Sequence, residues 1–110
     1  MTKPDHWDRI TVVLVTRNSE AILPLSLGSL AGARRFILID AMSTDDTIAV
    51  ARASHPAVEV LSLTEDRGLG AATNKGFALV DTEYVLNINP DTRMPEGCVE
   101  QLSRTADANP

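Results

Sequence analysis

The chain has 110 residues, 44% of them hydrophobic, which predicts a single globular domain with enough apolar residues for a core. Its net charge of −5 argues against non-specific binding of nucleic acid, which needs clustered cations. No apolar run approaches the ~18 residues of a membrane-spanning helix, and the lone Cys98 excludes both a disulfide framework and a cysteine-based zinc site. We therefore expect a cytoplasmic protein with a flexible leader over residues 1–9 and one domain over residues 10–110.

Strand-like and helical segments alternate along this domain. The first run, Ile10–Thr16, is apolar and β-branched, as in a strand that is buried on both faces. A helix capped by Asn18 or Ser19 should follow it, reach about Leu30 and end at Gly32. The other expected elements are a strand over Phe36–Ile39, a helix from Ser43–Asp46 to about His55, a strand over Val58–Leu63, a helix over Ala71–Val80, a strand over Glu83–Ile88 and a helix from Glu96 to about Ala106. This alternation predicts the α/β class, with a Rossmann-like parallel sheet covered by helices on both faces.

Polar loops follow several of the predicted strands. The carboxyl ends of parallel strands lie at one edge of a sheet, which is where ligands bind. Asp40 comes directly after a buried strand, so its carboxylate is placed to accept hydrogen bonds from a ribose hydroxyl or a base N–H. The alternative is that Asp40 caps the next helix through Ser43–Asp46, and Asp45 and Asp46 suit the positive end of that helix.

The loop Asn89-Pro90-Asp91-Thr92 is a candidate metal site. Asn89 offers an amide oxygen and Asp91 a carboxylate, and both are hard ligands suited to Mg²⁺ or Mn²⁺. Such a cation would join them to a diphosphate. The alternative is an Asx turn with Pro90 at its corner, in which both side chains bond nearby backbone N–H groups.

Two other loops could contact a nucleotide. The segment Thr16-Arg17-Asn18 offers backbone groups and a guanidinium, or else it only caps a helix. Gly68 and Gly70 partly match a dinucleotide-binding fingerprint, although Thr73 occupies the third glycine position. The alternative is that these glycines let the loop turn and let the helix pack closely on the sheet.

Taken together, four segments resemble family-2 glycosyltransferases in their order and spacing across about Ile10–Pro110. The segments are Val12–Glu20, Leu38–Thr47, Asp66–Gly76 and Tyr84–Thr92. The resemblance implies a GT-A fold and transfer of a sugar from a nucleoside-diphosphate donor.

The resemblance also assigns expected roles to residues. In that family the first-strand loop and the acid after the second strand hold the nucleoside, which implies this role for Thr16, Arg17, Asn18 and Asp40, with Gly68 also in the donor site. Asn89 and Asp91 stand where the family binds a divalent cation and the diphosphate. The Asn-Pro-Asp form is similar to a rhamnosyltransferase-type subgroup, which implies a dTDP-sugar or UDP-sugar donor and a saccharide or lipid-linked acceptor in cell-wall or polysaccharide biosynthesis.

The sequence also departs from the family pattern. Arg17 stands where the family often has tyrosine, and Asn89 replaces an aspartate, which leaves Asp91 as the main metal ligand. Family members continue well beyond this length, and the later part supplies the acceptor pocket and the general base. We therefore expect a donor-binding half with no catalytic base assigned and with an uncovered sheet edge, which predicts self-association or marginal stability.

Several functional questions stay open at this point. One alternative function is a dinucleotide-binding module, and another is a non-enzymatic remnant of the fold. Peripheral association with membranes is a further partner interaction that we consider alongside self-association.

Overall fold

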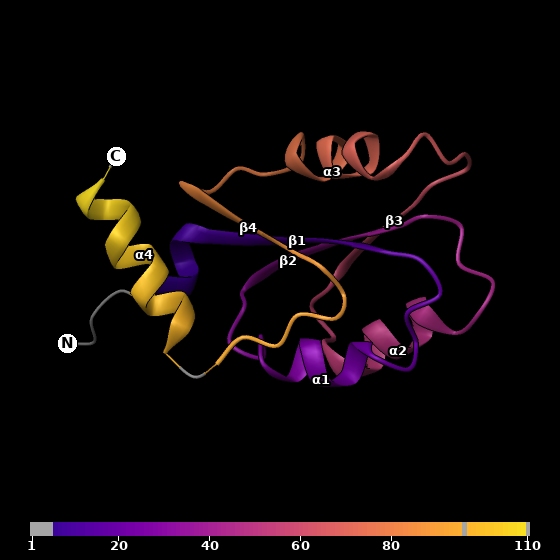
Figure 1. Ribbon diagram of the computed structural model, residues 1–110, viewed down its shortest axis with the longest axis horizontal. Coiled ribbons are helices and arrows are strands. Elements are labelled where there is room, and N and C mark those ends of the chain that lie inside the picture. Colours follow the sequence, from indigo (N-terminus) through magenta and orange to yellow (C-terminus); the bar gives the residue numbers. More distant parts are fainter. Residues whose placement is uncertain (1–5, 96, 110) are drawn as a thin grey trace.

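The computed structural model describes residues 6–95 and 97–109. Strands and helices alternate along the chain, as the sequence predicts (Figure 1). The elements are a 3₁₀ turn η1 (His6–Arg9), β1 (Ile10–Thr16), α1 (Leu23–Gly28), β2 (Arg35–Asp40), α2 (Thr47–Ser54), β3 (Glu59–Ser62), α3 (Leu69–Phe77), β4 (Tyr84–Ile88) and α4 (Cys98–Ala108). None of the helices within the described ranges combines the length and apolarity needed to cross a bilayer.

The four strands form one parallel sheet in the order β3-β2-β1-β4. The chain runs outward from β1 through β2 to β3, and α3 then carries it back across the sheet to β4 on the other side of β1. The strand order therefore reverses between β1 and β4, and this reversal point is where ligands bind in open α/β sheets. The predicted α/β class and the parallel sheet are confirmed.

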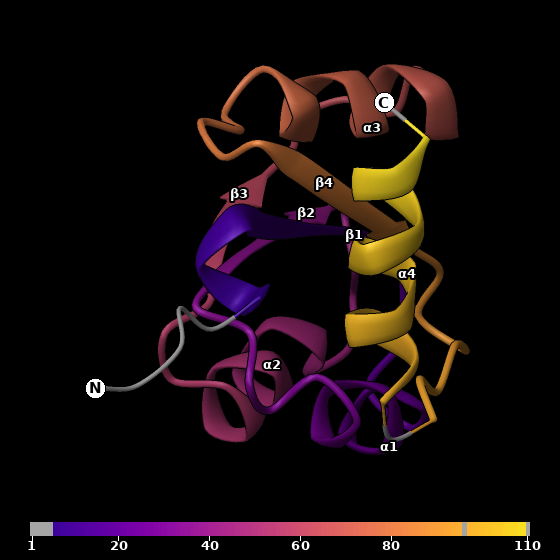
Figure 2. The same ribbon diagram turned by 90° about the vertical axis from the view of Figure 1, so that its left-hand side faces the viewer.

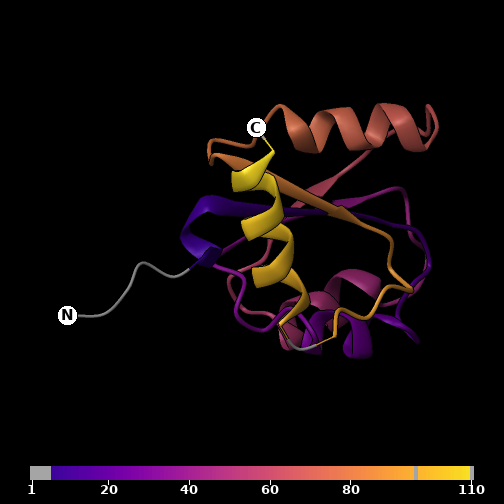
Figure 3. The same cartoon turned by 60° about the vertical axis from the view of Figure 1, so that its left-hand side comes forward.

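Helices cover both faces of the sheet. In Figure 2, α3 lies on one face and α1 and α2 lie on the other, while α4 stands beside the start of β1; the same layers appear in Figure 3. Because side chains alternate along a strand, Val12 and Leu14 enter the core under α1 and α2, whereas Val13 enters the core under α3. This arrangement confirms that β1 is a strand buried on both faces.

The first helix is shorter than predicted. It begins at Leu23, not next to Asn18 or Ser19, and the Ser19 carbonyl instead accepts the N–H groups of Ile22 and Leu23, each at 3.1 Å. Pro24 lies in the first turn of the helix, where its missing N–H is tolerated. The left-handed backbone of Asn18 (φ 48°) breaks the chain direction before the helix can start.

Gly32 does not end this helix, which stops at Gly28. A Cβ atom at Gly32 would lie 2.5 Å from Nε1 of Trp7, so the glycine makes room for the indole ring. Trp7 itself packs against the main core cluster. Residues 6–9 of the predicted leader form the turn η1, while residues 1–5 lie outside the described residues.

Close packing of α3 depends on Gly76, not on Gly68 or Gly70 as the sequence had suggested. A Cβ at Gly76 would lie 2.6 Å from Cγ1 of Val13 and 3.3 Å from Cγ1 of Ile39. A Cβ at Gly68 or Gly70 would meet nothing within 4 Å. Gly68 does provide the turn, because its φ of 93° is one that other residues rarely adopt.

Candidate functional site

The predicted site residues lie along the carboxyl edge of the sheet. Thr16 ends β1 and pairs with Asp40, which ends β2. Leu14 pairs with Ile88, the last residue of β4, so Asn89 leaves the sheet on the other side of β1. The fold thus brings the first-strand loop, the acid after the second strand and the Asn-Pro-Asp loop to the reversal point of the strand order.

Asp40 is buried, with 3% of its surface exposed, and three protein groups donate hydrogen bonds to it. Oδ1 accepts the hydroxyl of Thr16 at 2.9 Å and the hydroxyl of Ser43 at 2.6 Å. Oδ2 accepts the backbone N–H of Ser43 at 3.0 Å. Asp40 therefore holds the loop before α2 through Ser43 and does not itself cap the helix, whose first N–H donates to Asp45. Its contact with a nucleoside stays a prediction.

The loops after β1 and β2 are joined by reciprocal hydrogen bonds. The backbone N–H of Asn18 donates to Oγ of Ser43 at 2.9 Å, and Oδ1 of Asn18 accepts the backbone N–H of Thr44 at 2.8 Å. Asn18 and Met42 both have left-handed backbone conformations, with φ of 48° and 62°. Left-handed non-glycine residues persist only where the surroundings hold them, and they concentrate at functional sites.

A second set of contacts anchors the start of α2. The N–H of Ser19 donates to the hydroxyl of Thr47 at 2.8 Å, and Asp45 accepts both the hydroxyl and, at 3.0 Å, the N–H of Thr47. The Thr47 hydroxyl, with smaller contributions from the N–H groups of Thr47 and Glu20, lowers the pKa of the Asp45 carboxyl below its usual value. Asp45 thus has the helix-start role that the sequence predicted.

Arg17 and Gly68 meet through Asp66. Nη1 of Arg17 lies 2.7 Å from Oδ2 of Asp66, and the N–H of Gly68 donates to Oδ1 of Asp66 at 2.9 Å. This ion pair is exposed, so it is worth at most about 1 kcal/mol and an anionic ligand can compete for the guanidinium. The predicted contacts of Arg17 and Gly68 with a nucleotide sugar stay predictions.

Asn89 and Asp91 are exposed just beyond β4. The N–H of Thr92 donates to the backbone carbonyl of Asn89 at 3.0 Å, so backbone atoms close the turn. Within residues 6–95 and 97–109, neither side chain makes a hydrogen bond or an ion pair, and the Asx-turn alternative is not observed. Their oxygens are therefore available to a ligand.

A divalent cation fits these two residues only if other donors complete its shell. In the described part of the chain, no group of three or more His, Cys, Asp or Glu side chains could hold a metal ion. Asn89 and Asp91 offer two hard oxygens, and Mg²⁺ commonly takes one or two protein ligands together with substrate phosphates. The loop beyond them is held in place, because the N–H of Met94 donates to Oγ of Ser29 beyond α1 at 2.9 Å.

The cross-loop contacts of Ser43, Thr44 and Asp66 were not found from the sequence. These residues bond partners that are 25, 26 and 49 positions away along the chain. Only the pairing of β1 with β2 and the path of the loop before α3 bring them together. No spacing in the sequence marks them, although Ser43 and Thr44 belong to the polar segment predicted to cap α2.

Comparison with known proteins identifies the family. The sequence model of glycosyl transferase family 2 matches residues 11–110. An uncharacterized glycosyltransferase of Mycobacterium tuberculosis is 38% identical over 96 residues, which cover 86% of this chain and 42% of that protein. The pre-mycofactocin glycosyltransferase of the same species is 31% identical over 103 residues, covering 90% of this chain and 21% of that protein. The chain thus spans less than half the length of these relatives.

Solved structures show the same fold. TarS of Staphylococcus aureus, residues 1–349, superposes with a TM-score of 0.78 at 23% identity, covering 91% of this chain and 32% of that one. Glucosyl-3-phosphoglycerate synthase of M. tuberculosis, in complex with UDP, superposes with a TM-score of 0.66 at 28% identity, covering 76% and 34%. The same synthase has also been solved with Mg²⁺ and UDP. The fold is therefore of the GT-A type, and the chain belongs to glycosyltransferase family 2.

Proposed function

We propose that the chain is the donor-binding part of a glycosyltransferase that transfers a sugar from a nucleoside diphosphate to an acceptor hydroxyl. The observation that carries the proposal is the buried Asp40 on one side of β1 and, on the other, the side-chain oxygens of Asn89 and Asp91, which have no hydrogen-bond partner in the described part of the chain. These two positions are two strand spacings apart, or about 10 Å. A nucleoside diphosphate can span such a distance with its nucleoside at one end and its diphosphate at the other.

In this proposal the residues divide the donor between them. The nucleoside is held by Thr16, Arg17, Asn18 and Asp40, and the donor site also includes Gly68, which meets Arg17 through Asp66. Asp91, with Asn89 as the weaker ligand, holds a Mg²⁺ or Mn²⁺ ion against the diphosphate. That ion would neutralise the charge that develops on the leaving diphosphate. Support for the cation comes from the related synthase solved with Mg²⁺ and UDP.

The finer points of the proposal rest on the family resemblance. We infer a dTDP-sugar or UDP-sugar donor, a rhamnosyltransferase-like subgroup and a saccharide or lipid-linked acceptor in cell-wall or polysaccharide biosynthesis. UDP is supported by the synthase complex, in which that nucleotide is bound. A cytoplasmic location agrees with the lone cysteine of the sequence. No residue described here is assigned as the general base, so activity is proposed only for a protein that supplies one.

Substitution of Asp91 tests the metal role. Asp91→Ala removes the only carboxylate of the proposed metal pair, so Mn²⁺ should no longer strengthen UDP binding in a calorimetric titration. Asp81→Ala is the matched control, because Asp81 pairs with Arg35 at the opposite edge of the sheet. UDP affinity that still rises with Mn²⁺ in Asp91→Ala, to the same extent as in the control, would remove Asp91 from the site.

A further inference from the structure

Ser43 links Asp40 to the loop after β1. Its hydroxyl donates to Oδ1 of Asp40 at 2.6 Å and, through the same oxygen, accepts the N–H of Asn18 at 2.9 Å. Its backbone N–H donates to the other carboxylate oxygen of Asp40 at 3.0 Å. A serine hydroxyl has one proton to donate and lone pairs to accept, so these contacts are mutually compatible. One side chain therefore fixes the carboxylate and the neighbouring loop at the same time.

Further contacts reinforce this link. Thr44, the next residue, donates its N–H at 2.8 Å and its hydroxyl at 3.3 Å to Oδ1 of Asn18. The two left-handed residues, Asn18 and Met42, lie at this junction and require such support. Without the Ser43 hydroxyl, the N–H of Asn18 would lose its acceptor, and the two loops would be joined here only by the bonds from Thr44 to Asn18.

The contacts also limit what Asp40 can accept. A carboxylate offers about four acceptor positions, and three are occupied by the hydroxyl of Thr16 and the two donors of Ser43. Oδ1 accepts two of these hydrogen bonds and Oδ2 accepts one, so one acceptor position remains, on Oδ2. A base with a single ring N–H, such as uracil or thymine, needs one acceptor. Guanine presents a ring N–H beside an amino group and would need two parallel acceptors.

We propose that Ser43 is a positioning residue that holds Asp40 in a form open to one incoming donor, and so selects uracil or thymine nucleotides over guanine nucleotides. The inference rests on the proposed function, because it assumes that a nucleoside diphosphate occupies this edge. It goes further by naming the residue that sets base preference without touching the base.

Titration of the 110-residue chain and its Ser43 variants with UDP and with GDP tests this role. In Ser43→Ala, UDP affinity is expected to fall about tenfold while GDP affinity does not, so the preference for UDP shrinks. Ser43→Thr keeps the hydroxyl and is expected to bind UDP as the original chain does. Ser54→Ala, at the exposed last residue of α2, is the control and should change neither affinity.

Hydrogen exchange at the Asn18 amide gives a second readout that needs no ligand. The exchange should be faster in Ser43→Ala, because the acceptor of that N–H is lost, and unchanged in Ser43→Thr. Any one of three results with Ser43→Ala would overturn the inference. These are unchanged exchange at the Asn18 amide, a UDP affinity within about twofold of that of the original chain, and equal losses of affinity for UDP and GDP. An original chain that binds neither nucleotide would overturn the proposed function and this inference with it.

Discussion

At the scale of single residues, Gly76 determines how closely α3 approaches the sheet. Its missing side chain leaves room for Val13, which is fully buried in the middle of β1. The contact lies in a core where neighbouring side chains are held on all sides, so an added methyl group cannot be absorbed by a local shift.

Gly76→Ala should therefore lower the free energy of unfolding by up to about 2 kcal/mol. The overpacking penalty of about 1–3 kcal/mol outweighs the gain in helix propensity of about 1 kcal/mol. Gly70→Ala is the matched control on the same helix, since its Cβ would meet nothing, and it should leave stability unchanged or slightly raised. Urea denaturation of both variants measures the difference, and a stabilised Gly76→Ala would contradict the close contact.

Some of the residues in the site and the core could be predicted from the sequence, and others could not. The Asn-Pro-Asp loop and Asp40 were found because each follows an apolar, β-branched run, and a strand end is visible in the sequence. Gly76 was not singled out, because nothing next to it in the chain reveals that Val13 lies above it. The bonds that join Asn18 to Ser43 and Thr44 were missed for the same reason, since they depend on the pairing of β1 with β2.

At the scale of elements, the β-α alternation was predictable and the helix ends were less so. The apolar periodicity of residues 19–30 suggested a long helix, but Pro24 and the left-handed Asn18 shortened it to Leu23–Gly28. The helix α3 begins at Leu69 and ends at Phe77, two and three residues before the predicted limits. Boundaries move in this way because turns and tertiary contacts outweigh propensity at helix ends.

A cluster of charged groups holds α4 against the amino ends of β1 and β4. Arg9 donates to both carboxylate oxygens of Asp107 and, at 2.8 Å, to Glu83, while the hydroxyl of Tyr84 donates to Asp107 at 2.6 Å. The guanidinium of Arg9 also lies 5.1 Å from the centre of the Tyr84 ring. The bonds from Arg9, and then the bond from Tyr84, lower the pKa of the Asp107 carboxyl to about 2.

This cluster predicts a pH-dependent contribution of Asp107 to stability. A carboxyl whose pKa is lowered on folding stabilises the folded state above its unfolded pKa of 3.8, and the contribution is lost as the pH falls towards about 2. Asp107→Asn should therefore be less stable than the original chain at pH 6, and the two should converge near pH 2. Thermal unfolding across this range measures the difference, and a gap that is equally wide at low pH would contradict the assignment.

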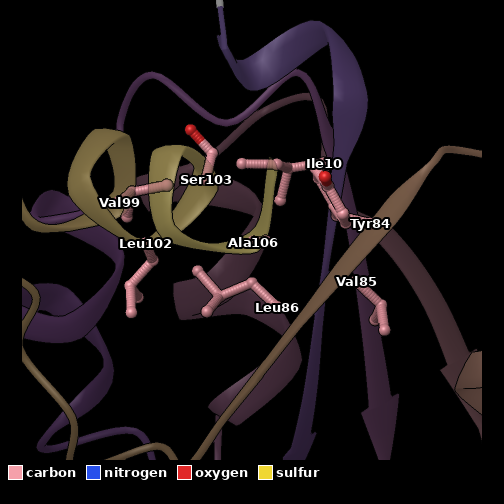
Figure 4. Close-up of a pocket in the computed structure, with 8 residues that line it drawn as sticks. All are labelled: Ile10, Tyr84, Val85, Leu86, Val99, Leu102, Ser103 and Ala106. Carbon is pink, nitrogen blue, oxygen red and sulfur yellow. The ribbon is translucent and has the colours of Figure 1, made fainter. Parts of the chain in front are cut away.

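At the scale of the whole molecule, β4 is an edge strand of the described sheet, and apolar surface surrounds it. Val85 on β4 is 42% exposed and Leu102 on α4 is 47% exposed. Between β4 and α4 lies an apolar hollow of about 230 Å³ whose lining includes Ile10, Leu86 and Leu102 (Figure 4). It lies beside the amino-terminal half of β4 and away from the carboxyl edge, so it is no part of the proposed donor site.

This exposed edge predicts that the 110-residue chain self-associates. An unpaired strand with an apolar flank is a template for another chain, and a charge on it blocks such pairing. Val85→Lys should shift the chain towards monomer in sedimentation velocity experiments at high concentration. Ala53→Lys, on the exposed surface of α2, is the control and should leave association unchanged. A monodisperse monomer before any substitution would contradict the prediction.

The most direct test of the donor-site assignment is calorimetric titration of the chain with UDP and dTDP, each with and without Mn²⁺, and with NAD as the control. We predict that at least one of the two nucleoside diphosphates binds, that Mn²⁺ strengthens this binding, and that NAD does not bind. Binding of NAD alone would point to a dinucleotide-binding module instead. Failure of both nucleoside diphosphates to bind, with or without the metal, would contradict the donor site at the carboxyl edge of the sheet.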